Sequence, residues 1–281
     1  MPRVLPEDFE NQPGHVLIYG GSGVGKTVLA GSALRDPTLC PIFYADFENG
    51  YISLKRFFGD LWDRMSLWTI HDMVEAGNIE KVAFAANSPF KTIVIDGVTM
   101  YHSLAMNTRL GGTTRAAGTP QQADYYQISA DILKLLWRIR RESKLNLIVT
   151  AGVQTVEDKA TESLVISPDI TGKLARRVPR IFDIVGYLTV DQRVTRAGKV
   201  TKEERYLQVQ PYNRVRAKDR SGGLGALVVN PTAKRLFDAL DHAPTPIFIG
   251  DDDEPEEEEV ELEPETAEEM LNGNQDEPAD E

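Results

Sequence analysis

The chain has 281 residues, of which 41% are hydrophobic, so it is long enough for one sizeable core. Its formal net charge of −12 is uneven: residues 251–281 carry 17 Asp or Glu and no Lys or Arg, which leaves 26 acidic and 31 basic residues in 1–250. One cysteine, Cys40, excludes an intramolecular disulfide and a multi-cysteine metal site, and no apolar run has the length of a membrane span. We therefore expect a cytoplasmic protein that makes no membrane contact.

The composition predicts a polar N-terminal arm over 1–14, one α/β domain over 15–243 and a disordered acidic tail over 244–281. Apolar, β-branched runs predict buried strands at 15–20, 40–46, 66–70, 90–97, 145–152, 181–190 and 205–210, the last two antiparallel. Helical spacing predicts helices at 25–35, 71–87, 122–143, near 171–178 and 230–240. Asn230 or Thr232 is the expected cap of the last helix. Alternating strands and helices indicate a doubly wound, mostly parallel sheet, whose ligands bind at the carboxyl ends of the strands.

The segment Gly20–Thr27, "GGSGVGKT", follows the first predicted strand and precedes the first predicted helix. It matches the pattern G-x-x-x-x-G-K-[ST], in which backbone N–H groups surround a polyphosphate. The loop residues Gly20, Gly21, Ser22, Gly23, Val24, Gly25, Lys26 and Thr27 are therefore expected to bind ATP. Lys26 would contact the β- and γ-phosphates, and the Thr27 hydroxyl would bind Mg²⁺.

Carboxylates stand at the ends of two other predicted strands. Asp96 ends "TIVID" and is expected to contact Mg²⁺, either directly or through water. Asp46 and Glu48 end "IFYADFE", where a carboxylate could orient or deprotonate an attacking water. Glu48 is the candidate base, against the alternative of a solvated loop glutamate.

Two further groups follow later strands. Lys218 and Arg220 lie two residues apart in "AKDRSG", so in an extended segment they point the same way and suit a phosphate in transfer. A solvated basic turn is the alternative. Thr150 or Gln154, after "LNLIV", is the candidate sensor of the γ-phosphate, and a plain strand end accounts for these residues equally well.

These segments resemble the RecA-like ATPases: "YADFEN" is similar to the strand that ends in their catalytic glutamate, and "TIVIDGVTMY" to their Walker B strand. "AKDRSG" is similar to their K-x-R-x-G element, which implies that Lys218 and Arg220 act in trans on the ATP of a neighbouring subunit. Over about residues 12–240 the chain resembles the short phage-encoded proteins of the fourth Sak group, which act in single-strand annealing or recombination. Members of that group often carry a histidine where Gly152 stands. The resemblance implies a phage protein in the host cytoplasm that forms a homo-oligomeric ring or filament with ATP at its subunit interfaces.

In RecA-like proteins two loops bind single-stranded DNA, and 107–121 and 152–169 are the corresponding segments here. Arg109 and Arg115 in the first are the candidate DNA contacts, with incidental arginines of a surface loop as the alternative. The resemblance favours an ATPase that acts on single-stranded DNA. A nucleotide-dependent adaptor or loader in replication and a small-molecule kinase remain as alternatives. The acidic tail is a candidate docking segment for a replication or single-strand-binding protein.

Overall fold

The computed structural model describes residues 12–111, 119–158, 163–170, 177–194 and 200–241. All of them belong to one compact unit, Met1–Pro244, and the second unit, Thr245–Glu281, lies outside the described residues. Among the described helices, none has both the length and the apolar character needed to cross a lipid bilayer. The boundaries of the arm, the domain and the tail remain predictions.

A sheet of nine strands forms the centre of the unit, in the order β11-β9-β8-β1-β5-β4-β2-β3, with β10 paired to β8. Strands β3, β2, β4, β5, β1 and β8 pair parallel in this succession, whereas β9 and β10 pair antiparallel with β8, and β11 pairs antiparallel with β9. The strands are β1 His15–Gly20, β2 Ile42–Asp46, β3 Met65–Thr69, β4 Thr92–Asp96, β5 Asn146–Ala151, β8 Ile184–Val194, β9 Val200–Gln208, β10 Lys218–Asp219 and β11 Leu227–Val229. The expected α/β fold with a mostly parallel sheet is confirmed.

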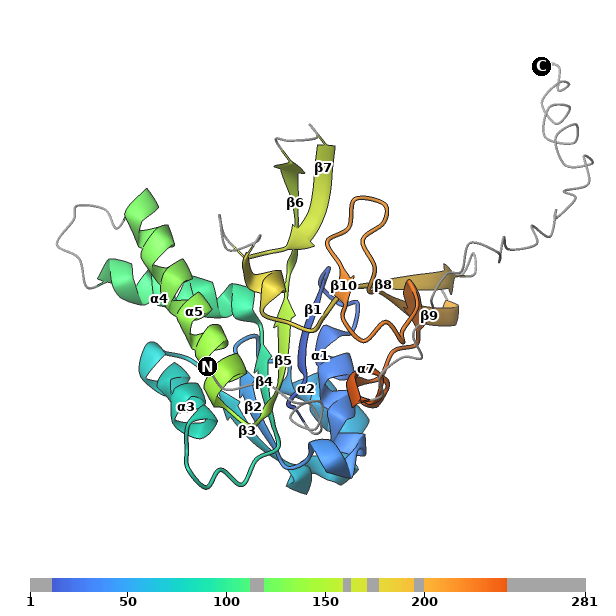
Figure 1. Cartoon of the computed structure of the whole chain (residues 1–281), viewed down its shortest axis with the longest axis horizontal. Helices are drawn as coiled ribbons and strands as arrows, with labels where there is room; N and C mark the ends of the chain where they lie inside the picture. The colour runs from blue at the N-terminus through green and yellow to red at the C-terminus, as the bar shows by residue number, and fades with distance from the viewer. Residues whose placement is uncertain (1–11, 112–118, 159–162, 171–176, 195–199, 242–281) are drawn as a thin grey trace, which may run out of the picture. The chain divides into compact units, whose positions relative to one another are not determined.

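Helices cover both faces of this sheet (Figure 1). One face packs against α3 Met73–Ala83, α4 Val98–Gly111 and α5 Gln122–Glu142, and the other against α1 Lys26–Gly31, α2 Tyr51–Phe58 and α7 Ala233–Asp241. Successive strand residues alternate between the two cores: in β1, Leu17 and Tyr19 face the first, and Val16 and Ile18 face the second. Since both faces are covered, the central strands are buried and read as continuous apolar runs.

Most of the predicted elements are present. Strands β8 and β9 are antiparallel as expected, and the Thr232 hydroxyl accepts the N–H of Arg235 at 3.3 Å, which caps α7. Asn230 does not cap this helix, because its side-chain oxygen accepts the N–H of Arg205 at 3.0 Å.

Three predicted boundaries were wrong. The loop expected from Asn107 begins later, because α4 continues to Gly111, with Val98, Tyr101, His102 and Met106 buried at helical spacing. The polar loop expected over 152–169 contains an antiparallel hairpin, β6 Val153–Asp158 and β7 Ser163–Pro168, in which Val156 pairs with Val165. The helix expected over 25–35 is α1 followed by a 3-10 turn at Ser32–Arg35. Of the short helix near 171–178, residues 171–176 lie outside the described residues, and the chain then forms a 3-10 turn, Val178–Arg180.

Candidate functional site

The glycine-rich loop joins the carboxyl end of β1 to the start of α1, as its motif requires. Lys26 folds back over this loop: its ammonium donates to the carbonyl oxygens of Gly20 at 3.1 Å and Gly21 at 2.9 Å. The lysine charge is therefore already held inside the loop that the motif assigns to phosphates. Oxygen atoms of a bound polyphosphate could replace the two carbonyls as its partners.

Thr27 and Asp96 come together around Gly50, which follows β2. A Cβ atom added at Gly50 would lie 3.1 Å from the Thr27 hydroxyl oxygen and 3.4 Å from Asp96 Oδ2. Gly50 thus lies close to both a hydroxyl and a carboxylate, the oxygen ligands that Mg²⁺ prefers. No group of three His, Cys, Asp or Glu side chains among the described residues is arranged to hold a metal. The arrangement fits Mg²⁺ held by one or two protein oxygens together with phosphate and water.

Two hydroxyl groups fix the orientation of the Asp96 carboxylate, which is fully buried. Tyr44 donates to its Oδ2 at 2.7 Å, and Thr150 donates to its Oδ1 at 2.5 Å. Thr150 in turn accepts the N–H of Gly97 at 2.8 Å. Burial, followed by the negative charge of Asp96, raises the pKa of Tyr44 well above its ordinary value, so the phenol keeps the proton it donates.

Both candidate sensors of the γ-phosphate, Thr150 and Gln154, form hydrogen bonds with other groups of the protein. Thr150 is fully buried, and its hydroxyl is bonded to Asp96. Gln154 lies in β6, where its side-chain N–H groups donate to the carbonyls of Pro168 at 2.8 Å and Ile170 at 3.2 Å. These contacts give Thr150 a role in orienting Asp96 and Gln154 a role in closing the base of the hairpin. A direct contact of either residue with a phosphate stays a prediction.

Glu48 reaches the same site from the turn after β2. A Cβ atom added at Gly97 would lie 2.9 Å from Glu48 Oε1, so the carboxylate packs directly over the residue that follows Asp96. Although the side chain is open to solvent, partial desolvation raises the pKa of Glu48, as does the charge of Asp96, while Lys26 opposes this shift. Glu48, Asp96 and Lys26 thus form one electrostatic group.

Asp46 holds the turn that carries Glu48. Its carboxylate is buried and accepts three backbone N–H groups, from Glu48 at 3.0 Å, Gly50 at 3.1 Å and Tyr51 at 3.0 Å. The turn also requires a left-handed backbone at Asn49, with a φ of 57°. Of the two carboxylates that follow the strand, one is therefore used to build the turn and the other is presented to the site.

Lys218 and Arg220 lie away from the phosphate loop of their own chain, further back along β8. Lys218 pairs with Val185 and hence lies level with Leu17, whereas Gly20 pairs with Leu188, three residues further along β8. At about 3.3 Å per residue this separates the two positions by about 10 Å along the strand. The structure thus does not bring Lys218 and Arg220 to the site of Lys26 and Glu48 within one chain.

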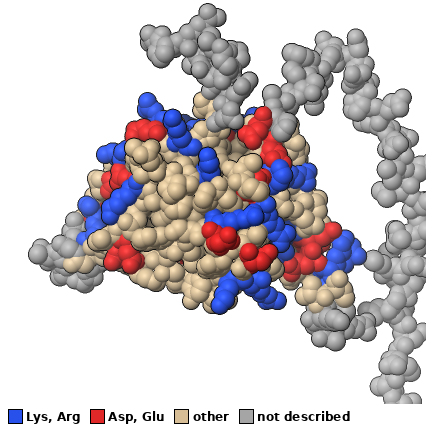
Figure 2. Space-filling model, turned by 90° about the horizontal axis from the view of Figure 1, so that it is seen from below, with Lys and Arg blue, Asp and Glu red and all other residues tan. Residues whose placement is uncertain are grey.

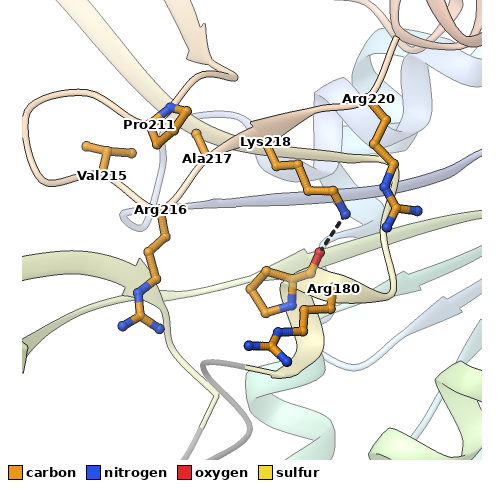
Figure 3. A pocket seen from close by; sticks show the side chains of 8 residues that line it. Arg180, Pro211, Val215, Arg216, Ala217, Lys218 and Arg220 are labelled. Carbon is orange, nitrogen blue, oxygen red and sulfur yellow. Dashed lines mark hydrogen bonds between the residues drawn. The ribbon is translucent and has the colours of Figure 1, made fainter.

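Lys218 and Arg220 instead border a cavity of about 710 Å³ together with Arg180 and Arg216 (Figure 3). The Lys218 ammonium donates to the carbonyls of Pro179, at 3.3 Å, and Phe182. Arg220 pairs with Asp183 at 3.1 Å, so both side chains reach the segment 179–183, as their spacing predicts. Desolvation, and then the nearby Arg220 charge, lower the pKa of Lys218 to about 8.

The candidate DNA contacts are only partly described. The Arg109 guanidinium, at the end of α4, pairs with the buried Asp124 at 2.8 Å and remains 41% exposed. Arg115 lies outside the described residues. On the face seen in Figure 2, Lys and Arg side chains lie in separate groups with Asp and Glu between them. The described surface on that face therefore presents mixed charges rather than one basic band.

One cationic residue next to the phosphate loop, Arg205, is not part of any motif that the sequence shows. Arg205 of β9 donates from Nε to the carbonyl of Val24 in the phosphate loop at 3.0 Å. Arg205 and Val24 are 181 residues apart, and only the antiparallel extension of the sheet brings them together.

A known protein family matches most of the chain. A family model described as "AAA domain" matches residues 12–221. No curated protein matches the chain. Among solved structures, the RadB recombinase matches 71% of this chain and 82% of its own at 17% identity and a TM-score of 0.42, a likeness too low to extend to function. Since the family model spans most of the chain, the protein belongs to the AAA domain family and is a P-loop ATPase.

Proposed function

We propose that the protein is a RecA-like, Mg²⁺-dependent ATPase that acts on single-stranded DNA as a homo-oligomer, in phage recombination or annealing. The observation that carries the hydrolytic part is the meeting of Lys26 and Thr27 with Asp96 and Glu48, from three separate segments. The motifs "YADFEN" and "AKDRSG" support the DNA-directed part by resemblance.

Glu48 is the proposed base. Its carboxylate lies beside Asp96, in the electrostatic field of Lys26, on a turn that three hydrogen bonds to Asp46 hold in place. A carboxylate fixed in this way can accept a proton from water as the water attacks the γ-phosphate. Lys26 would stabilise the negative charge that develops on the phosphate oxygens.

Thr27 and Asp96 are the proposed Mg²⁺ residues. Bound there, Mg²⁺ would neutralise phosphate charge during transfer. Tyr44 and Thr150 use one hydrogen bond each to hold the Asp96 carboxylate in a single orientation. Because the Asp96 carboxylate is already oriented, it needs little rearrangement when the metal binds.

The position of Lys218 and Arg220 supports oligomerisation. Both are distant from the loop of their own chain, yet they border an open basic cavity. Cations in that place are available to a phosphate carried by a neighbouring subunit, which is the trans role that the resemblance implies. Arg109, and Arg115 outside the described residues, are the proposed DNA contacts.

ATP turnover with and without single-stranded DNA tests the proposal. We expect DNA to stimulate phosphate release and Lys26→Ala to abolish it, while Lys134→Ala, an exposed lysine of α5, behaves as the parent. Removing one such donor costs roughly 100-fold or more in turnover. Phosphate transfer to a small acceptor would show a kinase instead. Nucleotide binding without turnover would show an adaptor or loader.

A further inference from the structure

Tyr19 directly precedes the phosphate loop, and its side chain is fully buried. Its hydroxyl donates to the carbonyl oxygen of Arg216 at 2.8 Å and lies 3.4 Å from the carbonyl oxygen of Ile166. Burial, and then the neighbouring Tyr187 phenol, raise the pKa of Tyr19 well above its ordinary value, so the hydroxyl keeps its proton and stays a donor. The hydroxyl thus joins β1 to backbone groups 147 and 197 positions further along the chain.

The segment 214–216 runs beside β7, with Val215 paired parallel to Ile166. The N–H of Ile166 donates to the carbonyl of Arg214 at 2.8 Å, and its carbonyl accepts the N–H of Arg216 at 3.0 Å. The carbonyl of Arg216 faces the other way and accepts the Tyr19 hydroxyl. Both backbone groups of Arg216 are therefore bonded, the N–H to β7 and the carbonyl to the side chain that precedes the phosphate loop.

The chain leads from Arg216 directly to the two cations. Arg216 and Lys218 line the same basic cavity, two residues apart (Figure 3). Strand β10 has two residues and pairs with β8 through them. Beyond it, the N–H of Arg220 donates to the carbonyl of Asp183 at 3.0 Å. So short a strand makes few ladder hydrogen bonds, and its course therefore depends on the anchors at either side, Asp183 after it and Tyr19 before it.

We propose that Tyr19 is a positioning residue for Lys218 and Arg220. Its hydroxyl anchors the carbonyl of Arg216 and thereby sets the place from which both cations meet the phosphate of a neighbouring subunit. The inference rests on the proposed action of these cations in trans. Because Tyr19 also adjoins Gly20, each chain has a direct link between the loop for its own nucleotide and the cations that it offers to its neighbour.

The first test is Tyr19→Phe, which keeps the buried ring and removes the hydroxyl. Loss of the bond to the Arg216 carbonyl should lower turnover about tenfold, while the affinity for Mg²⁺-ADP, which reports on the phosphate loop, stays within about twofold. Tyr187→Phe, in the ring whose centroid lies 5.2 Å from that of Tyr19, is the matched control and should behave as the parent. Thermal unfolding of each variant separates lost turnover from lost fold. An equal loss of ADP affinity would place the role of Tyr19 in the phosphate loop and overturn the proposal.

Mixed oligomers show through which group Tyr19 acts. Tyr19→Phe mixed with Glu48→Gln should exceed the sum of the activities that the two give separately, because some interfaces pair an intact Glu48 with cations that an intact Tyr19 positions. Tyr19→Phe mixed with Arg220→Ala should show no such gain, because neither chain offers both cations in place. Any other pattern would overturn the positioning role, provided that Glu48→Gln and Arg220→Ala recover together.

Amide hydrogen exchange tests the anchor without any turnover. The N–H groups over 214–220 should exchange faster in Tyr19→Phe than in the parent, whereas those of β1 should keep their protection. Parental exchange over 214–220 would overturn the anchoring, whatever the mixtures show. Failure of Glu48→Gln and Arg220→Ala to recover together would instead overturn action in trans, and the exchange measurement would still decide whether Tyr19 holds the segment.

Discussion

At the scale of single residues, the three carboxylates of the site differ in their hydrogen-bond partners and in their exposure to solvent. Asp46 is buried and bonded to backbone N–H groups, and Asp96 is buried between two hydroxyls. Glu48 is the carboxylate that stays open to solvent, with its pKa raised. A base must have room for the water it activates, so only Glu48 has surroundings that suit this role.

We expect Glu48→Gln to bind ATP with parental affinity and to lose at least about 100-fold in turnover, because the amide keeps the shape of the side chain but cannot accept the proton. Phosphate release and nucleotide titration measure the two quantities. Glu142→Gln, at an exposed position of α5, is the control. Turnover within a few-fold of the parent would assign the base elsewhere.

Lys218 gives a prediction about pH. Burial and the neighbouring Arg220 lower its pKa to about 8, so the ammonium is charged below that pH and neutral above it. If the charge acts on a phosphate, turnover should fall as the pH rises through about 8. Lys218→Arg should remove this fall, because a guanidinium keeps its proton. A Lys218→Arg profile that still declines near this pH would attribute the fall to another group.

At the scale of elements, Asp183 ties together three distant parts of the chain just before β8. It accepts from His15 at 3.1 Å, from Arg140 of α5 at 2.8 Å and from Arg220 at 3.1 Å. Hydrogen bonds and charges from His15 and Arg140 hold the pKa of Asp183 far below its ordinary value, against the opposing effect of burial. This one carboxylate thus connects β1, α5 and the segment that carries Arg220.

We expect Asp183→Asn to lower the free energy of unfolding by about 3 kcal/mol at neutral pH, because cations in a mostly buried site lose their partner. The lowered pKa means that this stability is present above the ordinary value of 3.8 and is lost as the pH falls below it. The difference in free energy of unfolding between parent and variant, measured with urea, should therefore become smaller below about pH 4. Asp191→Asn, at an exposed residue, is the control. A difference in free energy of unfolding that grows in acid would contradict the link between the pKa of Asp183 and stability.

At the scale of the whole molecule, two separate places along the sheet carry different parts of the proposed reaction. The phosphate loop and Glu48 lie at the carboxyl ends of the parallel strands, and β10 places Lys218 and Arg220 further back along β8. A single chain therefore contains both groups of residues, but they do not meet within that chain. The acidic segment 251–281 lies outside the described residues, and its role as a docking tail stays a prediction.

Mixing two variants tests whether neighbouring chains join these halves. Glu48→Gln and Arg220→Ala should each be inactive alone, whereas in mixed oligomers some interfaces pair an intact Glu48 with an intact Arg220. We expect part of the parental turnover to return. The control mixes each variant with a double variant that carries the same substitution: Glu48→Gln with Glu48→Gln/Lys26→Ala, and Arg220→Ala with Arg220→Ala/Lys26→Ala. Because both chains of each mixture share one substitution, no interface is complete. Co-assembly without recovery would count against action in trans.

The sequence alone predicted the nucleotide loop, the strand that precedes it, and the carboxylates that end β2 and β4. These are local signals: a glycine-rich turn, continuous apolar runs, and an acid at the end of two of those runs. The central strands were predictable because burial on both faces leaves no room for polar residues. Helices α2 and α4 and the hairpin β6–β7 were not predicted, because polar residues and exposed apolar residues such as Ile52, Met100 and Leu164 interrupt their periodicity.

Only the tertiary structure decided which partners these side chains meet. That Asp46 builds a turn while Glu48 faces the site depends on hydrogen bonds with backbone groups, which no side-chain pattern encodes. The contacts of Asp183 with Arg140 and of Arg205 with Val24 join residues 43 and 181 positions apart. Strand order and register set such contacts, and these follow from how the whole chain packs around its two cores.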